Sequence, residues 1–158
     1  MGHKVHPKIY RTQVIYTWDS RWYSKKNYAK YAEQDVRIRA YLMKKFKDAH
    51  IDSIAIERGA NAVTITIFAA KPGFIIGRGG QGLEDVKRAI ERQFLQMALK
   101  VKLNIQEVRS PALSAQIVGQ TIVSDIERRI PFRRVMKQTI ERVMKAGAKG
   151  VKIKMAGR

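Results

Sequence analysis

The sequence contains no cysteine, so it can form neither a disulfide framework nor a thiolate zinc site. This absence fits a reducing compartment. Long hydrophobic runs are missing as well, because no stretch approaches the roughly 20 apolar residues of a membrane span. The N-terminus also lacks an apolar core of signal-peptide length. We therefore expect a soluble intracellular protein without a membrane partner.

Acidic residues are scarce, and the scarcity is uneven along the chain. The 13 Asp and Glu stand against 32 Lys and Arg, which leaves a net charge of +19 over 158 residues. Residues 1–50 carry a net +8, residues 51–108 only +2, and residues 109–158 carry +9. Self-repulsion on this scale destabilises a folded chain unless an anion neutralises it. Two basic ends around a nearly neutral middle predict a polyanionic partner, with nucleic acid ahead of an anionic membrane surface.

The first fifty residues change from irregular to periodic. Residues 1–34 are rich in Lys, Arg, Tyr and Trp without clear periodicity, which predicts a basic N-terminal extension with one short helix. From Asp35 onward, apolar side chains recur at helical spacing. The predicted buried face of this helix consists of Ile38, Leu42, Phe46 and Ala49.

The middle of the chain predicts two strands, a glycine-rich loop, a helix and a third strand. Residues 51–58 and 62–69 alternate apolar and polar side chains, and the short connection between them is typical of a hairpin. Helical spacing returns after the glycines, and alternation resumes over residues 101–108. The side chains expected to face the core are Ile54, Ile56, Val63, Ile65, Ile67, Leu83, Val86, Ile90, Phe94, Met97, Leu103 and Ile105.

The last fifty residues predict two helices and a final strand. Ser110 suits an N-cap and the following proline suits the first helical position. Pro131 interrupts this helix, and Gly147 closes the next one. Alternation over Val151–Met155 predicts a strand. The expected apolar stripes are Leu113, Ile117, Ile122 and Ile126 in the first helix, and Phe132, Met136, Ile140 and Val143 in the second.

The segment FIIGRGGQG contains two overlapping glycine motifs. Gly77, Gly79 and Gly82 fit G-x-G-x-x-G, a dinucleotide fingerprint, whereas residues 77–80 fit G-x-x-G, a loop that contacts a nucleic-acid backbone. The fingerprint requires a strand that runs directly into the glycines, but a Lys-Pro-Gly segment intervenes here. A glycine-rich turn without a ligand is the third interpretation. We favour the backbone-binding loop, formed by Gly77, Arg78, Gly79 and Gly80.

Basic side chains also cluster around the turn between the last two helices. At about 100° per residue, Arg133, Arg134 and Lys137 fall in one arc beside the predicted apolar stripe. Charge runs are often merely solvated, but this arc contains Glu141 as its one acidic residue. The pattern therefore favours an RNA-binding face made of Arg128, Arg129, Arg133, Arg134 and Lys137.

Aromatic residues are concentrated among lysines near the start of the chain. The set consists of Trp18, Trp22, Tyr23, Tyr28 and Tyr31. Interleaved aromatic and cationic side chains suit stacking on RNA bases. Packing of the extension against the core explains the same pattern equally well, so both interpretations stay open.

No pattern in the sequence predicts catalysis or a cofactor. His3 and His6 have no Cys or nearby carboxylate to complete a metal site. No arrangement of Ser, His and Asp stands out from the background. We therefore predict a protein that is not an enzyme, with no catalytic residue, metal or cofactor.

The order of elements and five separated motifs resemble a known family. Helix, strand, strand, G-x-x-G between two helices, then strand is similar to a type II KH domain, an RNA-binding module. The segments MGHKVHP, AAKPGFIIGRGG, IQEVRSP, ERRIPFRRVMKQ and GAKGVKIKMAGR together resemble the small-subunit ribosomal protein S-three family. The resemblance implies an α+β fold, with a type II KH domain (helix-strand-strand-helix-helix-strand) over residues 35–108 and a small α+β domain over residues 109–158.

The resemblance also implies a role in translation. A protein of this family is a structural constituent of the small ribosomal subunit, binds rRNA in the subunit head and lines the mRNA entry channel. Its partners would be rRNA, mRNA and neighbouring small-subunit proteins, with no small-molecule substrate. The basic residues implicated in unwinding structured mRNA match Arg133, Arg134 and Lys137. The expected location is the cytoplasmic ribosome, with an organellar ribosome left open.

The sequence departs from the family at its end, because the family normally continues for several dozen residues beyond the final AGR. We therefore expect an incomplete C-terminal domain whose last strand, Val151–Met155, lacks covalently attached neighbours. Two alternative functions stay open at this point. The first is a free-standing KH protein that binds RNA, and the second is a nucleotide-binding enzyme that uses the loop Gly77–Gly82.

Overall fold

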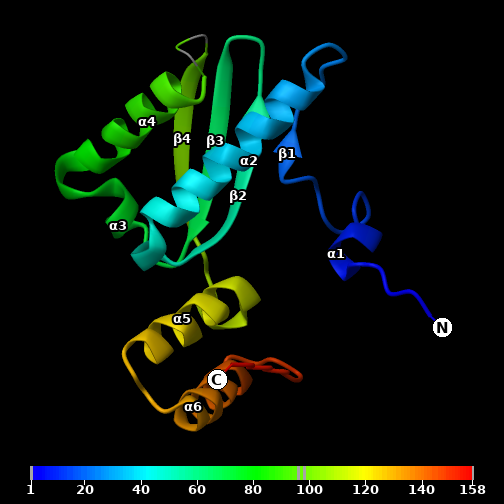
Figure 1. Cartoon of the computed structure of the whole chain (residues 1–158), viewed down its shortest axis with the longest axis vertical. Helices are drawn as coiled ribbons and strands as arrows, with labels where there is room; N and C mark the ends of the chain where they lie inside the picture. Colours follow the sequence, from blue (N-terminus) through cyan, green and yellow to red (C-terminus); the bar gives the residue numbers. More distant parts are fainter. Residues whose placement is uncertain (1, 96, 98, 158) are drawn as a thin grey trace.

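The computed structural model describes residues 2–157 except residues 96 and 98, and it confirms the predicted α+β class. A four-stranded sheet is covered on one face by helices, and two further helices follow it (Figure 1). The elements in chain order are α1 (Pro7–Tyr10), β1 (Ser20–Arg21), α2 (Tyr28–Lys45), η1 (Lys47–Ala49), β2 (Ile51–Arg58), β3 (Ala62–Ala69), α3 (Gly73–Ile76), η2 (Arg78–Gly80), α4 (Gln81–Gln93), β4 (Lys100–Glu107), η3 (Pro111–Leu113), α5 (Ala115–Glu127) and α6 (Phe132–Lys145).

The sheet has the strand order β1-β2-β3-β4. Strands β2 and β3 are antiparallel and joined by the predicted tight connection, where the Gly59 N–H donates to the Ala62 carbonyl at 2.9 Å. Strands β3 and β4 are parallel, so the chain must cross over between them. The crossover consists of α3, the glycine loop (residues 77–80) and α4. The loop therefore lies outside the sheet, between two helices (Figure 1).

The core lies between the sheet and the helices α2 and α4. Alternate side chains of β2 and β3 face it, as the alternation predicted, because successive side chains of a strand point to opposite faces. Burying each of these Ile or Val side chains contributes about 1.5–3 kcal/mol. The completely or almost completely buried members are Ile38, Leu42, Ile54, Ile56, Val63, Ile65, Ile67, Val86, Ile90 and Val101.

Two boundaries in this half differ from prediction. Helix α2 begins at Tyr28 rather than at Asp35, so the predicted limit between residues 34 and 35 lies inside a helix. Its first turns make contacts with the N-terminal segment and lack the apolar periodicity on which the prediction depended. Met97 was wrongly assigned to the buried face of α4, because the helix ends before it and Met97 is exposed in a left-handed conformation (φ 61°).

Helices α5 and α6 confirm the two helices predicted for residues 109–158, although the cap of the first one differs. Ser110 precedes the short 3-10 helix η3, while Ser114 caps α5 by accepting a hydrogen bond from the Ile117 N–H at 3.3 Å. Two polar contacts attach α5 to strand β2. The Ser114 hydroxyl donates to Asp52, and the Gln120 Nε2 donates to the Ile51 carbonyl at 2.9 Å.

The buried face of α6 is rotated from the predicted one. Val143 is buried as predicted, but the other buried residues are Val135 and Thr139, whereas Phe132 and Ile140 are 56% and 39% exposed. The stripe predicted for the first of these helices is also only partly buried. Ile117 of α5 is buried, whereas Ile126 of α5 and Leu113, which belongs to η3, are exposed. Helices α5 and α6 bury only narrow faces against each other, because two packed helices share less surface than a helix packed on a sheet.

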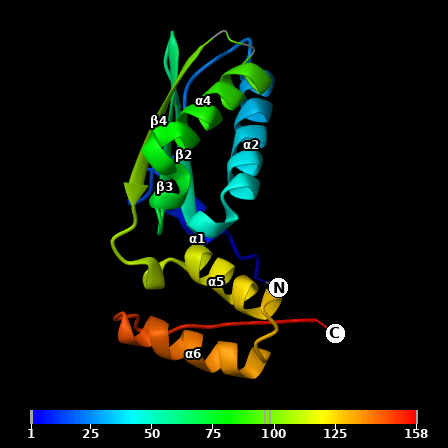
Figure 2. The ribbon, with the colours of Figure 1, turned by 90° about the vertical axis from the view of Figure 1, so that its left-hand side faces the viewer.

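The predicted final strand is absent from the part of the chain that the structure describes. Residues 151–157 are extended but form no ladder, and they run beside α6 in both views (Figures 1 and 2). Val151, Ile153 and Met155 are half-buried and the two lysines between them are exposed, so the predicted alternation exists without a sheet. A strand needs a neighbour for its N–H and C=O groups, and the described residues place none there.

Candidate nucleic-acid interface

The glycine loop, residues 77–80, connects two helices. Helix α3 ends at Gly77 (φ 71°, ψ −178°), and the short helix η2 leads directly into α4. Strand β3 ends at Ala69, well before the glycines. This order contradicts the dinucleotide fingerprint, which requires a strand to enter the loop. It matches the G-x-x-G arrangement instead.

Each glycine of the loop region has its own structural reason. Gly79 and Gly80 adopt left-handed conformations (φ 62° and 78°), and a Cβ added to either would meet no described atom within 4 Å. The backbone is therefore open to a large anion at this point. Gly82 is favoured by packing, because a Cβ there would lie 3.1 Å from the Ile75 carbonyl oxygen, a tight contact. The third glycine of the apparent fingerprint thus allows α3 to approach α4.

The electrostatics of the loop favour an anion. Helix α4 begins at the loop, and Gly80 at its N-cap provides no side chain to occupy the first N–H groups. These groups and the helix dipole attract negative charge. Glu84 in the first turn is opposed by Arg88, whose Nη2 lies 3.4 Å from its carboxylate. The side chain of Arg78, which we predicted to bind RNA, lies outside the part that the structure describes.

The α6 basic patch, formed by Arg133, Arg134 and Lys137, is exposed as predicted. Arg133 lies over the ring of Phe132, with its Cζ 5.8 Å from the ring centroid. The two arginines stand in the first turn of α6, and no acidic residue of the described chain shares that turn. Cations at a helix N-terminus oppose the helix dipole and lower stability. The helix dipole therefore does not explain why two arginines stand at this end of α6.

Arg128 and Arg129 lie in the turn between α5 and α6, next to the patch. Arg128 is the C-cap of α5, where a cation is favourable to the helix dipole. Arg129 has a left-handed backbone (φ 62°), and its N–H donates to the Ile126 carbonyl at 2.8 Å. The structure thus gathers all five predicted arginines and lysines around one turn. The glycine loop forms a separate site on the other half, and both lie on the left-hand side of Figure 1.

Comparisons with known proteins agree with this two-part geometry. The family model of the KH domain matches residues 37–113, and that of the ribosomal protein S3 C-terminal domain matches residues 122–158. The small ribosomal subunit protein uS3 of Enterococcus faecalis is 43% identical over 158 residues, which is 100% of this chain and 71% of the relative. The uS3 of Desulforamulus reducens is 45% identical over 159 residues, again with 100% and 71% covered.

The chain belongs to the ribosomal protein uS3 family. The uS3 of Myxococcus xanthus, 44% identical over 100% of this chain and 70% of its own length, leads to the same conclusion. The KH match includes the glycine loop, and the C-terminal match includes the α6 basic patch. The predicted family and its two-part architecture are confirmed.

In this uS3-family chain, part of the aromatic cluster packs inside the protein. The Trp22 Nε1 donates to the Asp35 carboxylate at 2.8 Å, and the Trp22 ring meets Tyr31 edge-on at 5.5 Å between centroids. The Arg58 guanidinium lies 4.7 Å from the centroid of the Tyr31 ring. Packing thus accounts for Trp22 and Tyr31. Tyr28 also contacts Trp22, with 5.3 Å between the ring centroids, although it is largely exposed like Trp18 and Tyr23.

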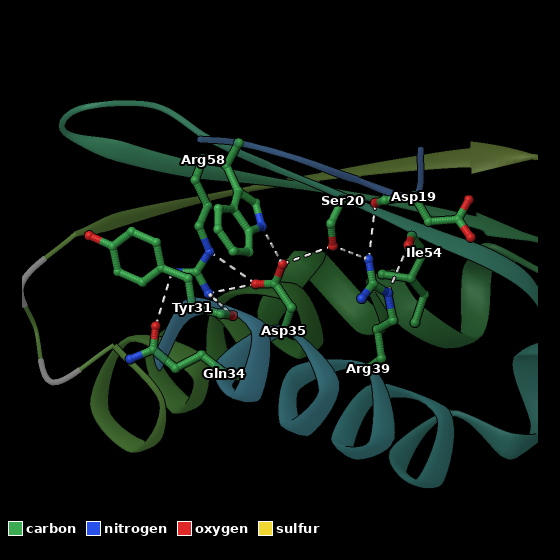
Figure 3. Close-up of polar contacts among 9 residues, drawn as sticks. Asp19, Ser20, Tyr31, Gln34, Asp35, Arg39, Ile54 and Arg58 are labelled. Carbon is green, nitrogen blue, oxygen red and sulfur yellow. Dashed lines mark hydrogen bonds and ion pairs between the residues drawn. The ribbon is translucent and has the colours of Figure 1, made fainter. Parts of the chain in front are cut away.

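Figure 3 shows the polar network that holds the N-terminal segment, and sequence reasoning missed it. Asp35 and Arg58 are 2% and 3% exposed in their side chains and lie 2.5 Å apart. The Ser20 hydroxyl donates to Asp35 at 2.8 Å, and the Arg39 Nη2 donates to the Asp19 carbonyl at 3.0 Å. No local motif marks these residues, because the network joins three segments that are distant in sequence.

The described residues contain neither a cluster of metal-ligating side chains nor a membrane-spanning helix. Within residues 2–95, 97 and 99–157, no three His, Cys, Asp or Glu side chains gather closely enough to hold a metal ion. His6 instead accepts a hydrogen bond from the Lys8 N–H at 3.2 Å through its Nδ1. None of the helices in the described chain is long and apolar enough to cross a membrane.

Proposed function

We propose that this chain is a structural constituent of the small ribosomal subunit that binds rRNA in the subunit head. The observation that carries the proposal is the similarity of the whole chain to small ribosomal subunit proteins, together with an open G-x-x-G loop. The net charge of +19 suits a polyanionic partner. Its partners are then rRNA, mRNA and neighbouring small-subunit proteins, and its location is the cytoplasmic ribosome. The protein acts by binding and has no enzymatic activity.

The glycine loop binds a sugar-phosphate backbone in this proposal. Gly79 and Gly80 present bare backbone to the solvent, and the first N–H groups of α4 follow directly. A phosphate can approach these N–H groups closely, since neither glycine has a side chain. Contacts of this kind position the RNA and carry little sequence information.

The α6 basic patch lines the mRNA entry channel in the same proposal. Three exposed cations on one arc of a helix can hold the phosphates of single-stranded mRNA. Such contacts favour the single strand over a base-paired stem at the entry point and need no ATP. The patch would thus help to hold or unwind incoming mRNA.

Sedimentation of a cell extract tests the ribosomal assignment. We expect the protein to migrate with small ribosomal subunits in a sucrose gradient, and to stay with them after a high-salt wash. Migration outside the subunits would favour a free-standing KH protein that binds RNA. Stoichiometric binding of NAD or ATP by the purified, RNase-treated chain would favour a nucleotide-binding enzyme and contradict the proposal.

Ribosomes carrying a variant chain test the role in the channel. Replacement of Arg133, Arg134 and Lys137 by Ala should slow translation through structured mRNA more than through unstructured mRNA of equal length. The matched variant replaces Arg142, Lys145 and Lys149, which removes the same charge elsewhere on the C-terminal half. Equal slowing on both mRNAs would indicate that the patch anchors rRNA and does not act on incoming mRNA.

A further inference from the structure

A pocket of about 760 Å³ lies between the KH half and α5. Its walls come from the end of α2, the start of β2, the region of α3 and one face of α5. The volume is within the range of about 300–1,000 Å³ that is typical of ligand sites. The pocket is distinct from the glycine loop, and none of the predicted site residues except Arg128 lines it.

Two buried polar atoms at this pocket have no hydrogen-bond partner among the described residues, the Nδ1 of His50 and the Oε1 of Gln120. The Gln120 Nε2 donates to the Ile51 carbonyl at 2.9 Å, which fixes the amide so that Oε1 can only accept. A buried acceptor without a donor is unfavourable, and such groups in folded proteins usually have a partner. Both atoms are closed to solvent, so an N–H or O–H donor of an occupant can pair with Oε1 only if the Gln120 side chain turns toward the pocket.

The walls and the rim of the pocket further define the occupant. Phe46, Phe74 and Val123 supply apolar surface, and Phe74 remains 62% exposed. At the rim, Lys47, Lys71 and Arg128 stand against Asp48 and Glu127, so cations outnumber anions by one. The pair of Lys47 and Glu127, at 3.7 Å, is exposed and therefore weak. An occupant with a flat apolar face, donors on its edge and an attached anion fits the apolar walls, the unpaired acceptor of Gln120 and the cationic rim.

We infer that this pocket takes an unstacked nucleobase of a bound RNA strand. The base would lie against the phenylalanine rings, donate from its edge to Gln120 Oε1 once that side chain turns toward the pocket, and leave its phosphate at the cationic rim. Phe74 belongs to α3, which leads directly into the glycine loop, so a strand on the loop can continue toward the pocket. The inference rests on the proposed RNA binding and adds to it a contact with a base rather than with the backbone.

Gly119 provides a direct test, because it lines the pocket and a Cβ added there meets no described atom within 4 Å. Gly119→Leu should fill the pocket while α5 remains folded, since Leu is a better helix former than Gly. The control, Gln138→Leu, adds the same side chain at an exposed position of α6. Two probes of equal length and charge are compared by fluorescence anisotropy with the full chain. One is oligoadenylate, and the other is an abasic ribose-phosphate strand.

We expect Gly119→Leu to weaken binding of oligoadenylate by about five- to a hundredfold, the usual effect of losing one stacked base. Binding of the abasic strand should not change, and Gln138→Leu should affect neither probe. Ultraviolet cross-linking of oligoadenylate to the unaltered chain should label peptides from residues 43–51 or 115–128. The melting temperature of Gly119→Leu checks that the variant is folded.

Three results would overturn the inference, each with a different meaning. Unchanged oligoadenylate affinity in Gly119→Leu, without cross-links to the pocket, would leave the proposed RNA binding in place and remove only the base contact. Unchanged RNA affinity with loss of incorporation into small subunits would assign the pocket to a side chain of a neighbouring protein. Failure of the unaltered chain to bind either probe would overturn the proposed RNA binding as well.

Discussion

The pair of Asp35 and Arg58 shows how one buried contact can hold a segment with little core of its own. Its two side chains are almost fully buried, and the carboxylate also accepts hydrogen bonds from Ser20 and Trp22. A buried pair adds little net stability compared with an apolar pair, but loss of one partner leaves an uncompensated charge. The pair therefore specifies where the N-terminal segment lies, and its disruption should be costly.

We predict that Asp35→Ala lowers the free energy of unfolding by about 3–5 kcal/mol, because Arg58 stays buried without its partner. Urea denaturation of the full chain measures this change. The control is Glu33→Ala, which removes an exposed pair with Arg37 in the same helix and should cost only about 0.2–0.5 kcal/mol. Equal losses in the two variants would contradict the role of the network.

Gly79 allows the charge of the glycine loop to be tested at constant shape. Asn and Asp both tolerate the left-handed conformation, so Gly79→Asn and Gly79→Asp should have similar melting temperatures. Only Asp places a carboxylate against the expected phosphate, a repulsion of about 1–4 kcal/mol at contact distance. We predict at least about fivefold weaker binding of single-stranded RNA by Gly79→Asp than by Gly79→Asn, measured by anisotropy. Equal affinities would argue against a phosphate at this loop.

Among the elements, β2 and β3 were predictable because their alternate residues are buried between the sheet and the helices α2 and α4. Helix α2 was predicted seven residues short, since its first turns depend on contacts with the N-terminal segment rather than on periodicity. The last strand failed for a related reason. The alternation in Val151–Met155 correctly indicates which side chains are half-buried. A strand also needs a neighbouring strand, and the local sequence does not reveal whether one is present.

The candidate sites were likewise predictable where local spacing defines them and unpredictable where contacts between distant segments do. The glycine loop and the basic turn follow from local spacing, and the structure places both on the surface. The buried face of α6 was wrong by about one residue position around the helix, because hydrophobicity marked Phe132 and Ile140 whereas packing selects Val135 and Thr139. The pocket could not be predicted at all. It depends on a contact between Gln120 and Ile51 that joins two halves of the chain.

Helix α6 carries a prediction about counterions. Each phosphate contact made by single-stranded RNA releases about 0.7 counterion, so replacing Arg133, Arg134 and Lys137 by Ala should flatten the log–log salt dependence of binding by roughly 2 units. The fold should survive, because Val135, Thr139 and Val143 are untouched and Ala favours the helix. Titrations of single-stranded RNA at several salt concentrations measure the slope.

The control for this experiment replaces Arg142, Lys145 and Lys149, so that both variants have the same net charge. If the patch binds phosphates, the salt dependence of RNA binding should flatten clearly more in the variant that lacks the patch than in the control. Identical slopes in both variants would mean that only the overall charge of the protein matters.

At the scale of the whole molecule, the charge distribution predicts how stability responds to salt. A net charge of +19 on a chain of this size produces repulsion between its own parts, and salt screens repulsion between exposed charges. The exposed ion pairs, such as Lys8 with Asp19 and Arg21 with Glu57, lose stability in salt, but each contributes little. The buried pair of Asp35 and Arg58 is screened much less. Repulsion should therefore dominate the response.

We predict that the Tm of the isolated chain rises between low and moderate NaCl concentration, and that each kcal/mol gained raises it by roughly 2–4 °C. A short RNA at low salt should raise the Tm further, because it binds the folded chain and neutralises the same charges. Differential scanning calorimetry measures both shifts, and dextran of similar size serves as the uncharged control. RNA should lose its effect at high salt, since counterion release no longer favours binding. A Tm that falls with salt, or an equal gain from dextran and RNA, would mean that packing rather than charge limits the stability of the free protein.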